Sequence, residues 1–427
     1  MQRLIFHVDV NSAYLSWEAA RRVSEGGEDL RLIPSAIGGD PAKRTGVILA
    51  KSIPAKAFGV QTGEPVAAAL RKCPSLVLAR PDFQLYVKNS RAFIDICRRY
   101  APVVEQVSID ECFLDMSGTD YLYPDPLQIA AVIKDSIRDQ LGFTVNVGIS
   151  RNKLLAKMAS DFEKPDKIHT LFPEEVAEKM WPLPVRELFS VGHATAEKLR
   201  RSSIFTIGEL AASDPRVVTQ LLGVKLGTQL HAYANGQDES PVAAQPEEAK
   251  GYSISTTLED DVRAAEDAKR ILLALSDSVS AHMRKEKARA GCIAVTIRAN
   301  DFKNRSHQRH LEEPTDITDE IYAVVAALFD ELWDRKTPLR LLGVALTDID
   351  RGESAQLSLF GDAQRERARR RDQAVDAIRR KFGSDTIVRG SALDSDLHVG
   401  RKYRANAEND RLDGNAPKPA EESDLLD

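Results

Sequence analysis

Three carboxylate residues lie where the chain is otherwise apolar and prone to form strands. Asp110 and Glu111 are adjacent within the segment 107–115, and Asp9 follows the apolar run 4–8. Adjacent carboxylates in such a segment are costly to bury unless a cation or another partner satisfies them. In a regular strand the side chains of Asp110 and Glu111 point to opposite faces. Both acids therefore serve one site only if a strand ends or turns tightly between them.

Two interpretations of these acids stay open from their spacing alone. Carboxylates at strand ends of one sheet could bind two divalent metal ions about 4 Å apart, an arrangement that stabilises the attacking and leaving oxygens in phosphoryl transfer. Mg²⁺ prefers such oxygen ligands and keeps water and substrate phosphates in its shell. Alternatively, all three acids lie in loops at strand ends and cap helices.

Strands alternating with helices must position these acids. A strand is expected at residues 4–10, followed by Asn11 and Ser12 as N-cap residues of a helix that runs to Val23. Further strands are expected at 46–50, twice within 103–116 and at 143–149, with helices at 127–141 and 153–162. This alternation indicates an α/β or α+β domain.

A helical region and a second α+β domain are expected after it. Residues 174–235 have helical spacing with glycines at the breaks, and residues 236–249 have the composition of a linker. Beyond the linker we expect strands near 252–257, at 292–298 and at 341–349, one helix to about Arg284 and another at 317–333.

The composition is that of a globular protein. The chain has 427 residues, of which 43% are apolar and 29% charged, and a net charge of −5. Its longest apolar run, residues 321–329, is nine residues long, whereas a membrane span needs about 20. The four cysteines form no CxxC pair, which argues against a disulfide framework or a structural zinc site and favours a cytoplasmic location.

Charge is unevenly distributed along the chain. Residues 408–427 carry seven acidic and two basic residues, which equals the whole net charge, and we interpret them as a disordered acidic tail. Residues 281–310 carry eight basic and two acidic residues, and residues 363–382 carry eight basic and three acidic ones. Such blocks fit solvated helix or strand faces as well as surfaces that face phosphates.

Two motifs make the chain similar to a known family. Residues 6–14, Phe-His-Val-Asp-Val-Asn-Ser-Ala-Tyr, together with the Ser-Ile-Asp-Glu at 108–111, resemble the Y-family of translesion DNA polymerases, the group of bacterial polymerases IV and V. The resemblance covers roughly residues 1–400. It implies an α+β multidomain right hand with palm, fingers and helical thumb, then a C-terminal α+β little finger and a flexible tail.

The motifs place the implied domain boundaries as follows. The palm takes residues 1–10 and 76–170, and the fingers take residues 11–75. A thumb with a helix-hairpin-helix takes residues 171–236 and is followed by a linker at 237–249. The little finger takes residues 250–352, and a tail takes residues 353–427.

The resemblance also assigns roles around the acids. Asp9, Asp110, Glu111 and the backbone carbonyl of Val10 would hold two Mg²⁺ ions, which activate the primer 3′-hydroxyl and neutralise the triphosphate. The backbone amides of Ser12, Ala13 and Tyr14, at a helix N-terminus, would face the triphosphate. The ring of Tyr14 would be a steric gate beneath the incoming sugar, although its pattern alone favours an aromatic residue on the buried face of a helix.

The fingers depart from the family pattern. Many members have a tyrosine and an arginine, three residues apart, that bind the triphosphate just before a Phe-Gly turn; here these positions are Ile53 and Lys56. Ile53 has no hydroxyl, and Lys56 keeps the charge without the bidentate fork of arginine. Lys51 is a candidate substitute. Lys164 matches the palm lysine that reaches the triphosphate.

DNA-binding residues are implied in two further places. Residues 191–199 resemble a helix-hairpin-helix, in which backbone amides hold a DNA phosphate without reading sequence, although an ordinary turn between helices fits the same pattern. Its candidate residues are Gly192, Thr195 and Lys198. In the basic block of the little finger, the candidates for phosphate contacts are Arg298, Lys303, Arg305 and Arg309.

A short apolar motif stands in the polar C-terminal region. Residues 356–360, Gln-Leu-Ser-Leu-Phe, closely match the peptide by which bacterial polymerases bind the sliding clamp. An extended segment with such anchors fills a hydrophobic groove on its partner. The anchor residues would be Gln356, Leu357, Leu359 and Phe360.

The resemblance thus predicts a low-fidelity, DNA-directed DNA polymerase for lesion bypass in DNA repair and the SOS response. Its partners would be primer-template DNA, deoxynucleoside triphosphates and the sliding clamp, and it would act as a monomer. Two other classes remain: a non-catalytic clamp-bound adaptor of the same fold, and a nuclease that uses the same acids with two metals. The presence of all three carboxylates argues against the adaptor, and Tyr14 with the clamp motif argues against the nuclease.

Overall fold

The computed structural model describes residues 3–40, 46–244, 248–352, 363–383 and 386–390. It contains two compact units, the first ending at Pro246 and the second beginning at Glu247, within the segment predicted as a linker. The finer division of the first unit into palm, fingers and thumb stays a prediction. In the described residues no helix is both long and apolar enough to cross a membrane.

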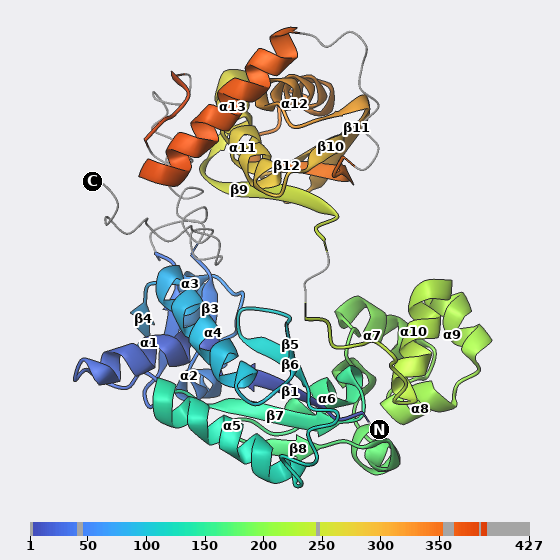
Figure 1. Cartoon of the computed structure of the whole chain (residues 1–427). Helices are drawn as coiled ribbons and strands as arrows, with labels where there is room; N and C mark the ends of the chain where they lie inside the picture. The colour runs from blue at the N-terminus through green and yellow to red at the C-terminus, as the bar shows by residue number, and fades with distance from the viewer. Residues whose placement is uncertain (1–2, 41–45, 245–247, 353–362, 384–385, 391–427) are drawn as a thin grey trace, which may run out of the picture. The chain divides into compact units, whose positions relative to one another are not determined.

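A five-stranded sheet organises the first unit (Figure 1). Its central strand β1 (Ile5–Val10) pairs antiparallel with β6 (Glu111–Asp115) on one side and with β7 (Val145–Ser150) on the other. Strands β5 (Val103–Gln106) and β8 (Ile168–Thr170) form the edges. The strands predicted within 4–10, 103–116 and 143–149 are confirmed.

The alternation of side chains along β1 separates the core from the acids. Phe6, Val8 and Val10 are buried in the main core. Three helices supply much of that core: α1 (Ala13–Ser24), α4 (Phe83–Arg98) and α5 (Pro126–Leu141). Successive side chains of a strand point to opposite faces, so Asp9 lies on the other face, which is covered by α6 (Lys153–Ser160).

Helix α6 approaches the sheet closely at a glycine. A Cβ atom on Gly148 of β7 would lie 2.0 Å from the carbonyl oxygen of Ala156 and 2.5 Å from the amide nitrogen of Ser160, both in α6. Only a residue without a side chain allows such an approach of backbone to backbone. Gly148 therefore fixes how near α6 lies to β1 and β7.

A smaller sheet packs its own core in the first unit. Strands β2 (Ser35–Gly38), β3 (Ile48–Lys51) and β4 (Val77–Ala79) lie in the order β3-β2-β4. Helices α2 (Ile53–Ala57) and α3 (Val66–Lys72) contribute buried residues to the same core. This sheet presents the end of β3 and helix α2 to the site described below.

The helices predicted for residues 174–235 are confirmed. They begin with short helical turns at Pro173–Glu175, Val176–Met180 and Val185–Glu187. Four helices follow: α7 (His193–Arg201), α8 (Ile207–Ala212), α9 (Pro215–Leu222) and α10 (Val224–Ala234). Their buried residues form a separate core that also includes residues of α6.

The second unit is a four-stranded antiparallel sheet in the order β11-β10-β12-β9, packed against two helices. Strands β9 (Gly251–Val262), β10 (Arg289–Ala299) and β12 (Leu339–Asp350) and helices α11 (Ala265–Lys285) and α12 (Thr318–Leu332) match predicted elements. Strand β11 (Asn304–Thr315) was not predicted. It is an edge strand with mostly exposed polar side chains, so it lacks the apolar alternation of a half-buried strand.

The expectation of a flexible tail from residue 353 is wrong for residues 363–382, which form helix α13 (Ala363–Phe382). Of its side chains only Asp372 is buried, so no apolar periodicity marks the helix. Its arginines bind acidic residues of the second unit; Arg365, for example, donates hydrogen bonds to Glu313 and Glu320. The clamp motif at 356–360 and the acidic segment 408–427 lie outside the described residues.

Candidate active site

Asp9 and Glu111 lie directly opposite each other in the antiparallel pair β1–β6. Asp110 comes just before β6, where the amides of Val107 and Ser108 donate to the carbonyl oxygen of Glu111. The amide of Val10 donates to the carbonyl oxygen of Asp110 at 2.9 Å. A tight turn at residues 107–110 therefore precedes β6, and the strand begins between Asp110 and Glu111. Because the strand does not extend through both acids, both side chains can lie near Asp9.

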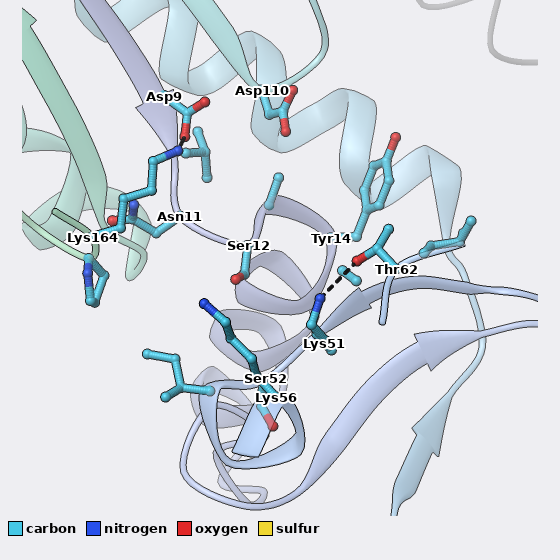
Figure 2. Close-up of a pocket in the computed structure, with 16 residues that line it drawn as sticks. Asp9, Asn11, Ser12, Tyr14, Lys51, Ser52, Lys56, Thr62, Asp110 and Lys164 are labelled. Carbon is cyan, nitrogen blue, oxygen red and sulfur yellow. Dashed lines mark hydrogen bonds and ion pairs between the residues drawn. The ribbon is translucent and has the colours of Figure 1, made fainter. Parts of the chain in front are cut away.

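One cleft of about 460 Å³ brings together most of the predicted metal- and nucleotide-binding residues (Figure 2). Those that line it are Asp9, Val10, Ser12, Ala13, Tyr14, Lys56, Asp110 and Lys164. The candidate Lys51 lines it too, as do Asn11, Ser52 and Thr62, which were not predicted as site residues. Glu111, alone among the predicted metal ligands, does not line the cleft.

Two residues contact the carboxylate of Glu111: His7 of β1 and Lys157 of α6. Its Oε2 lies 3.2 Å from Nε2 of the buried His7 and 2.7 Å from Nζ of Lys157. These hydrogen bonds, first that of His7 and then that of Lys157, lower the pKa of Glu111 to about 2. Lys157 also lies 3.6 Å from Asp9. Sequence reasoning missed both residues, although a histidine within the apolar run before Asp9 was a signal.

Asp110 has the opposite electrostatic environment. Burial raises its pKa, as do the negative charges of Asp9 and Glu111, against the hydrogen bond from Ser108 Oγ at 2.6 Å. No ion pair to Asp110 occurs within the described ranges. An additional positive charge in the cleft would therefore stabilise its ionised form.

Asp9 is paired with a lysine on the far side of the cleft. Its Oδ1 lies 2.6 Å from Nζ of Lys164, which also lies 2.9 Å from Asp161. Lys164 binds Asp9 and Lys157 binds Glu111. In the described part of the chain no three metal-ligating side chains are grouped so as to hold one metal ion. The carboxylate oxygens of Asp9 and Asp110 are nevertheless hard donors facing one cleft, a set that suits a divalent cation such as Mg²⁺.

The ring of Tyr14 is firmly held at the cleft wall. It stacks on Tyr86 with ring centroids 4.7 Å apart, and Trp17 and Phe83 approach its edge. Burial, with the nearby charge of Asp110, raises the pKa of Tyr14. Ser12 is the N-cap residue, as expected, but it has φ of 48° and its side chain makes no capping hydrogen bond. The first turn of α1 contains no acid.

The remaining predicted residues lie outside this cleft. Gly192 is the N-cap residue of α7, and Thr195 and Lys198 lie in its first two turns. In the second unit each predicted basic residue has a polar partner: Arg298 has Asn304, Lys303 has Asp301, Arg305 has Asp334, and Arg309 has Glu331. Of these four basic residues Lys303 is the most exposed, with 80% of its side-chain surface accessible.

Comparison with known proteins gives consistent matches along the chain. Residues 8–161 match the impB/mucB/samB family, residues 249–359 match the C-terminal domain of that family, and residues 186–238 match the thumb domain of DNA polymerase iota.

Whole-length relatives point the same way. The chain is 42% identical to DNA polymerase IV of Clostridium acetobutylicum, over 93% of this chain and all of the relative. It is 37% identical to DNA polymerase IV 1 of Bacillus subtilis, over 92% of this chain and 93% of the relative. A solved Y-family DNA polymerase chimera superposes with a TM-score of 0.71 at 22% identity, over 81% of this chain and 99% of the chimera. The chain therefore belongs to the Y-family of DNA polymerases and is a DNA-directed DNA polymerase.

Proposed function

We propose that this polymerase extends a primer by in-line attack of its 3′-hydroxyl on the α-phosphate of a deoxynucleoside triphosphate, with two Mg²⁺ ions; the bond between the α- and β-phosphates breaks and pyrophosphate leaves. Family membership implies a DNA template, nucleotide substrates and a divalent metal ion. The observation that carries the proposal is the single cleft in which Asp9 and Asp110 face the N-terminus of α1 and three lysines. Acids alone would repel a triphosphate, and lysines alone would leave the metal without ligands.

The metal ligands proposed are Asp9, Asp110, Glu111 and the carbonyl oxygen of Val10. When bound there, divalent ions lower the pKa of the attacking hydroxyl and neutralise charge on the triphosphate. Lys157 and His7 hold Glu111 on the same sheet face as Asp9. We assign them a positioning role, because they contact a ligand carboxylate rather than the cleft.

The nucleotide would be held from both sides of the cleft. The free amides at the start of α1, in Ser12, Ala13 and Tyr14, suit phosphate oxygens, and Lys56 and Lys164 supply positive charge. Tyr14 would exclude a 2′-hydroxyl, since Tyr86 behind its ring leaves it no room to retreat.

DNA contacts are proposed in both units. In the first unit the N-terminus of α7, with Gly192, Thr195 and Lys198, would hold a backbone phosphate. In the second unit, four basic residues on β10, β11 and the turn between them would contact phosphates once their polar pairs are exchanged for DNA: Arg298, Lys303, Arg305 and Arg309. Exposed ion pairs contribute little, so this exchange costs little.

We further propose that the enzyme bypasses lesions during DNA repair, including the SOS response, as a monomer tethered to the bacterial sliding clamp. The support for tethering is the motif at 356–360, with Gln356, Leu357, Leu359 and Phe360 as anchors. Co-purification with the clamp, measured for the wild type and for Phe360→Ala, tests this part independently. Retention of Phe360→Ala at wild-type levels would contradict it.

A primer-extension assay in Mg²⁺ tests the central proposal. The wild type should extend a primed template, and Asp110→Ala should not. Extension that survives the substitution would refute the metal assignment. Primer shortening would instead indicate a nuclease, and no reaction with retained clamp binding would indicate an adaptor.

A further inference from the structure

Two lysines enter the cleft from β3 and α2 without a carboxylate to bind. Lys51 ends β3, and its Nζ donates to the neutral hydroxyl of Thr62 at 3.3 Å. The side chain of Lys56 in α2 makes no hydrogen bond or ion pair with any residue that the structure describes. Glu64, an acid near Lys51, is paired with Lys72 at 2.5 Å. Lys164, by contrast, is bound to Asp9 and Asp161. The cleft therefore has two lysine charges available to a ligand.

The corner between β3 and α2 holds these two lysines rigidly. The Ser52 hydroxyl accepts hydrogen bonds from the amides of Ser35 and Ala55 and donates to the carbonyl oxygen of Ile33. Ser52 thus ties the start of α2 to the neighbouring segment 33–35. Figure 2 shows the amino group of Lys56 directed toward Ser12 and that of Lys51 directed toward Thr62, and both lysines line the same cleft as Asp9 and Asp110. A rigid base reduces the entropy lost when a ligand is bound.

The rest of this wall has little else to hold an anion. Ile53, between the two lysines, lines the cleft with 63% of its surface exposed and has no polar side-chain atom. Facing it is the N-terminus of α1, whose positive end of the helix dipole favours negative charge. Two cations opposite a helix N-terminus form a complement for a polyphosphate rather than for a sugar or a base.

We propose that Lys51 is a second triphosphate-binding residue, acting beside Lys56, and that Thr62 positions it. Many family members have a tyrosine hydroxyl at the position of Ile53; in this chain a second positive charge, that of Lys51, would take its place. This inference rests on the proposed nucleotide site, and it assigns Lys51 a direct contact with the phosphates. A lysine–phosphate hydrogen bond is charge-assisted, and its loss corresponds to about ten- to a hundredfold in affinity.

The test compares full-length Lys51→Gln and Lys51→Arg with the wild type. Insertion of one deoxynucleotide gives kcat and KM, inhibition by inorganic pyrophosphate reports phosphate contacts alone, and calorimetry with a Mg²⁺–deoxynucleoside triphosphate measures binding without turnover. Arg71→Gln is the matched control, because Arg71 is an exposed residue of α3 in the same small sheet region and does not line the cleft.

Lys51→Gln should raise KM and the pyrophosphate inhibition constant by about ten- to a hundredfold with kcat changed less than about threefold. Lys51→Arg should recover most of the affinity, and Thr62→Val should raise KM by only a few-fold. Unchanged KM and pyrophosphate inhibition in Lys51→Gln would overturn the inference. Losses of affinity in Lys51→Arg and Arg71→Gln as large as that in Lys51→Gln would overturn it too. A wild type that binds nucleotide but does not extend primers would refute the proposed function and leave the role of Lys51 to the calorimetric comparison.

Discussion

Charged side chains meet in two places in this chain, with opposite results. In the second unit, arginines of α13 form ion pairs with acidic residues of α11, of α12 and of the loop just before α12. In the cleft of the first unit, Asp110, Lys51 and Lys56 have no oppositely charged partner within the described ranges. The first arrangement holds a helix in place, and the second leaves charge available to ligands.

The interface of α13 is built almost wholly from ion pairs. Arg284 of α11 binds Asp376 at 2.7 Å and lies 3.6 Å from Asp372, and the Arg284 and Asp372 side chains are nearly fully buried. Arg369 binds Asp316, and Arg379 binds Asp277, each within 3 Å. Apolar burial contributes little here, because the helix has only Asp372 fully buried.

The comparison shows that a basic block in a sequence does not reveal what it binds. Residues 363–382 are as rich in arginine as a nucleic-acid-binding segment, yet many of those arginines are paired within their own unit. The charges of the cleft are few and come from positions between Asp9 and Lys164 in the chain; Asp9 and Lys164 bind each other, but Asp110, Lys51 and Lys56 have no oppositely charged partner among the described residues. The two regions therefore differ in whether their charged side chains form ion pairs in the fold, and not in how many charged residues lie close together in the sequence.

Asp110→Asn gives the largest expected effect and separates activity from stability. Because no ion pair is lost, the midpoint of thermal unfolding should stay within a few degrees of the wild type or rise. Nucleotide insertion should fall by about a thousandfold or more, as a metal ligand is removed. Single-turnover insertion and thermal melting of the same preparation measure both. A large loss of stability without loss of insertion would reverse the comparison.

Arg284→Ala should have the opposite profile. It leaves Asp372 and Asp376 without their buried cation, and breaking a buried pair costs about 3–5 kcal/mol. Urea unfolding should show this loss, while the KM for nucleotide stays unchanged. Arg370→Ala is the control, since Arg370 is 77% exposed and pairs with Glu366 one turn away, so about 0.5 kcal/mol or less is expected.

Tyr14→Ala tests the uncharged wall of the cleft. Without the ring that Tyr86 supports, a 2′-hydroxyl meets no obstacle, so discrimination against ribonucleotides should fall by about a hundredfold. Competitive insertion of matched ribo- and deoxynucleotides measures the ratio. Discrimination equal to that of the wild type would remove Tyr14 from the sugar site and leave it a core aromatic.

Glu111 belongs to the site yet is paired as the acids of α13 are, because Lys157 lies 2.7 Å from its carboxylate. Its pKa is lowered from its ordinary value of 4.5 to about 2. The stabilisation is therefore complete above pH 4.5 and is lost as the pH falls toward 2. The free energy of unfolding of the wild type should decline across this window more steeply than that of Glu111→Gln. Parallel declines would mean that His7 and Lys157 do not stabilise the carboxylate.

Lys303→Ala should give the smallest effect. Its pair with Asp301 is exposed, so stability should not change. Affinity for primer-template DNA should fall only a few-fold and uniformly across sequences, and the slope of log affinity against log salt should drop by about one. Fluorescence anisotropy at several salt concentrations measures it, and an unchanged slope would remove Lys303 from the DNA-binding surface.

Much of the fold was predictable because most elements carry a regular pattern of apolar residues. Strand β1 and helix α12 are examples, and their expected bounds differ by one or two residues from those in the structure. Strand β11 and helix α13 could not be found this way. One is held by backbone pairing with β10 and the other by ion pairs, and neither kind of interaction leaves an apolar period in the sequence.

The site was partly predictable for a similar reason. Asp9 and Asp110 are recognisable in the sequence as acids beside apolar runs. The motif at residues 108–111 is recognisable by its resemblance to the family. Lys157 and His7 were missed, because a lysine on a helix and a histidine in a strand are ordinary in sequence. Their significance comes from the register that sets Asp9 opposite Glu111 and from the depth at which α6 lies.

That depth makes one position unusually intolerant to substitution. In a library of random variants, every replacement of Gly148 should be lost, alanine included, because any side chain would push α6 off the sheet and carry Lys157 and Ser160 away from their partners. Gly192, where an added Cβ meets open space, should accept alanine with its fold intact. Two glycines of one unit thus differ most in the substitutions they tolerate. Gly148 maintains the distance between α6 and the sheet, whereas Gly192 lies at the N-terminus of α7, where an added Cβ has open space.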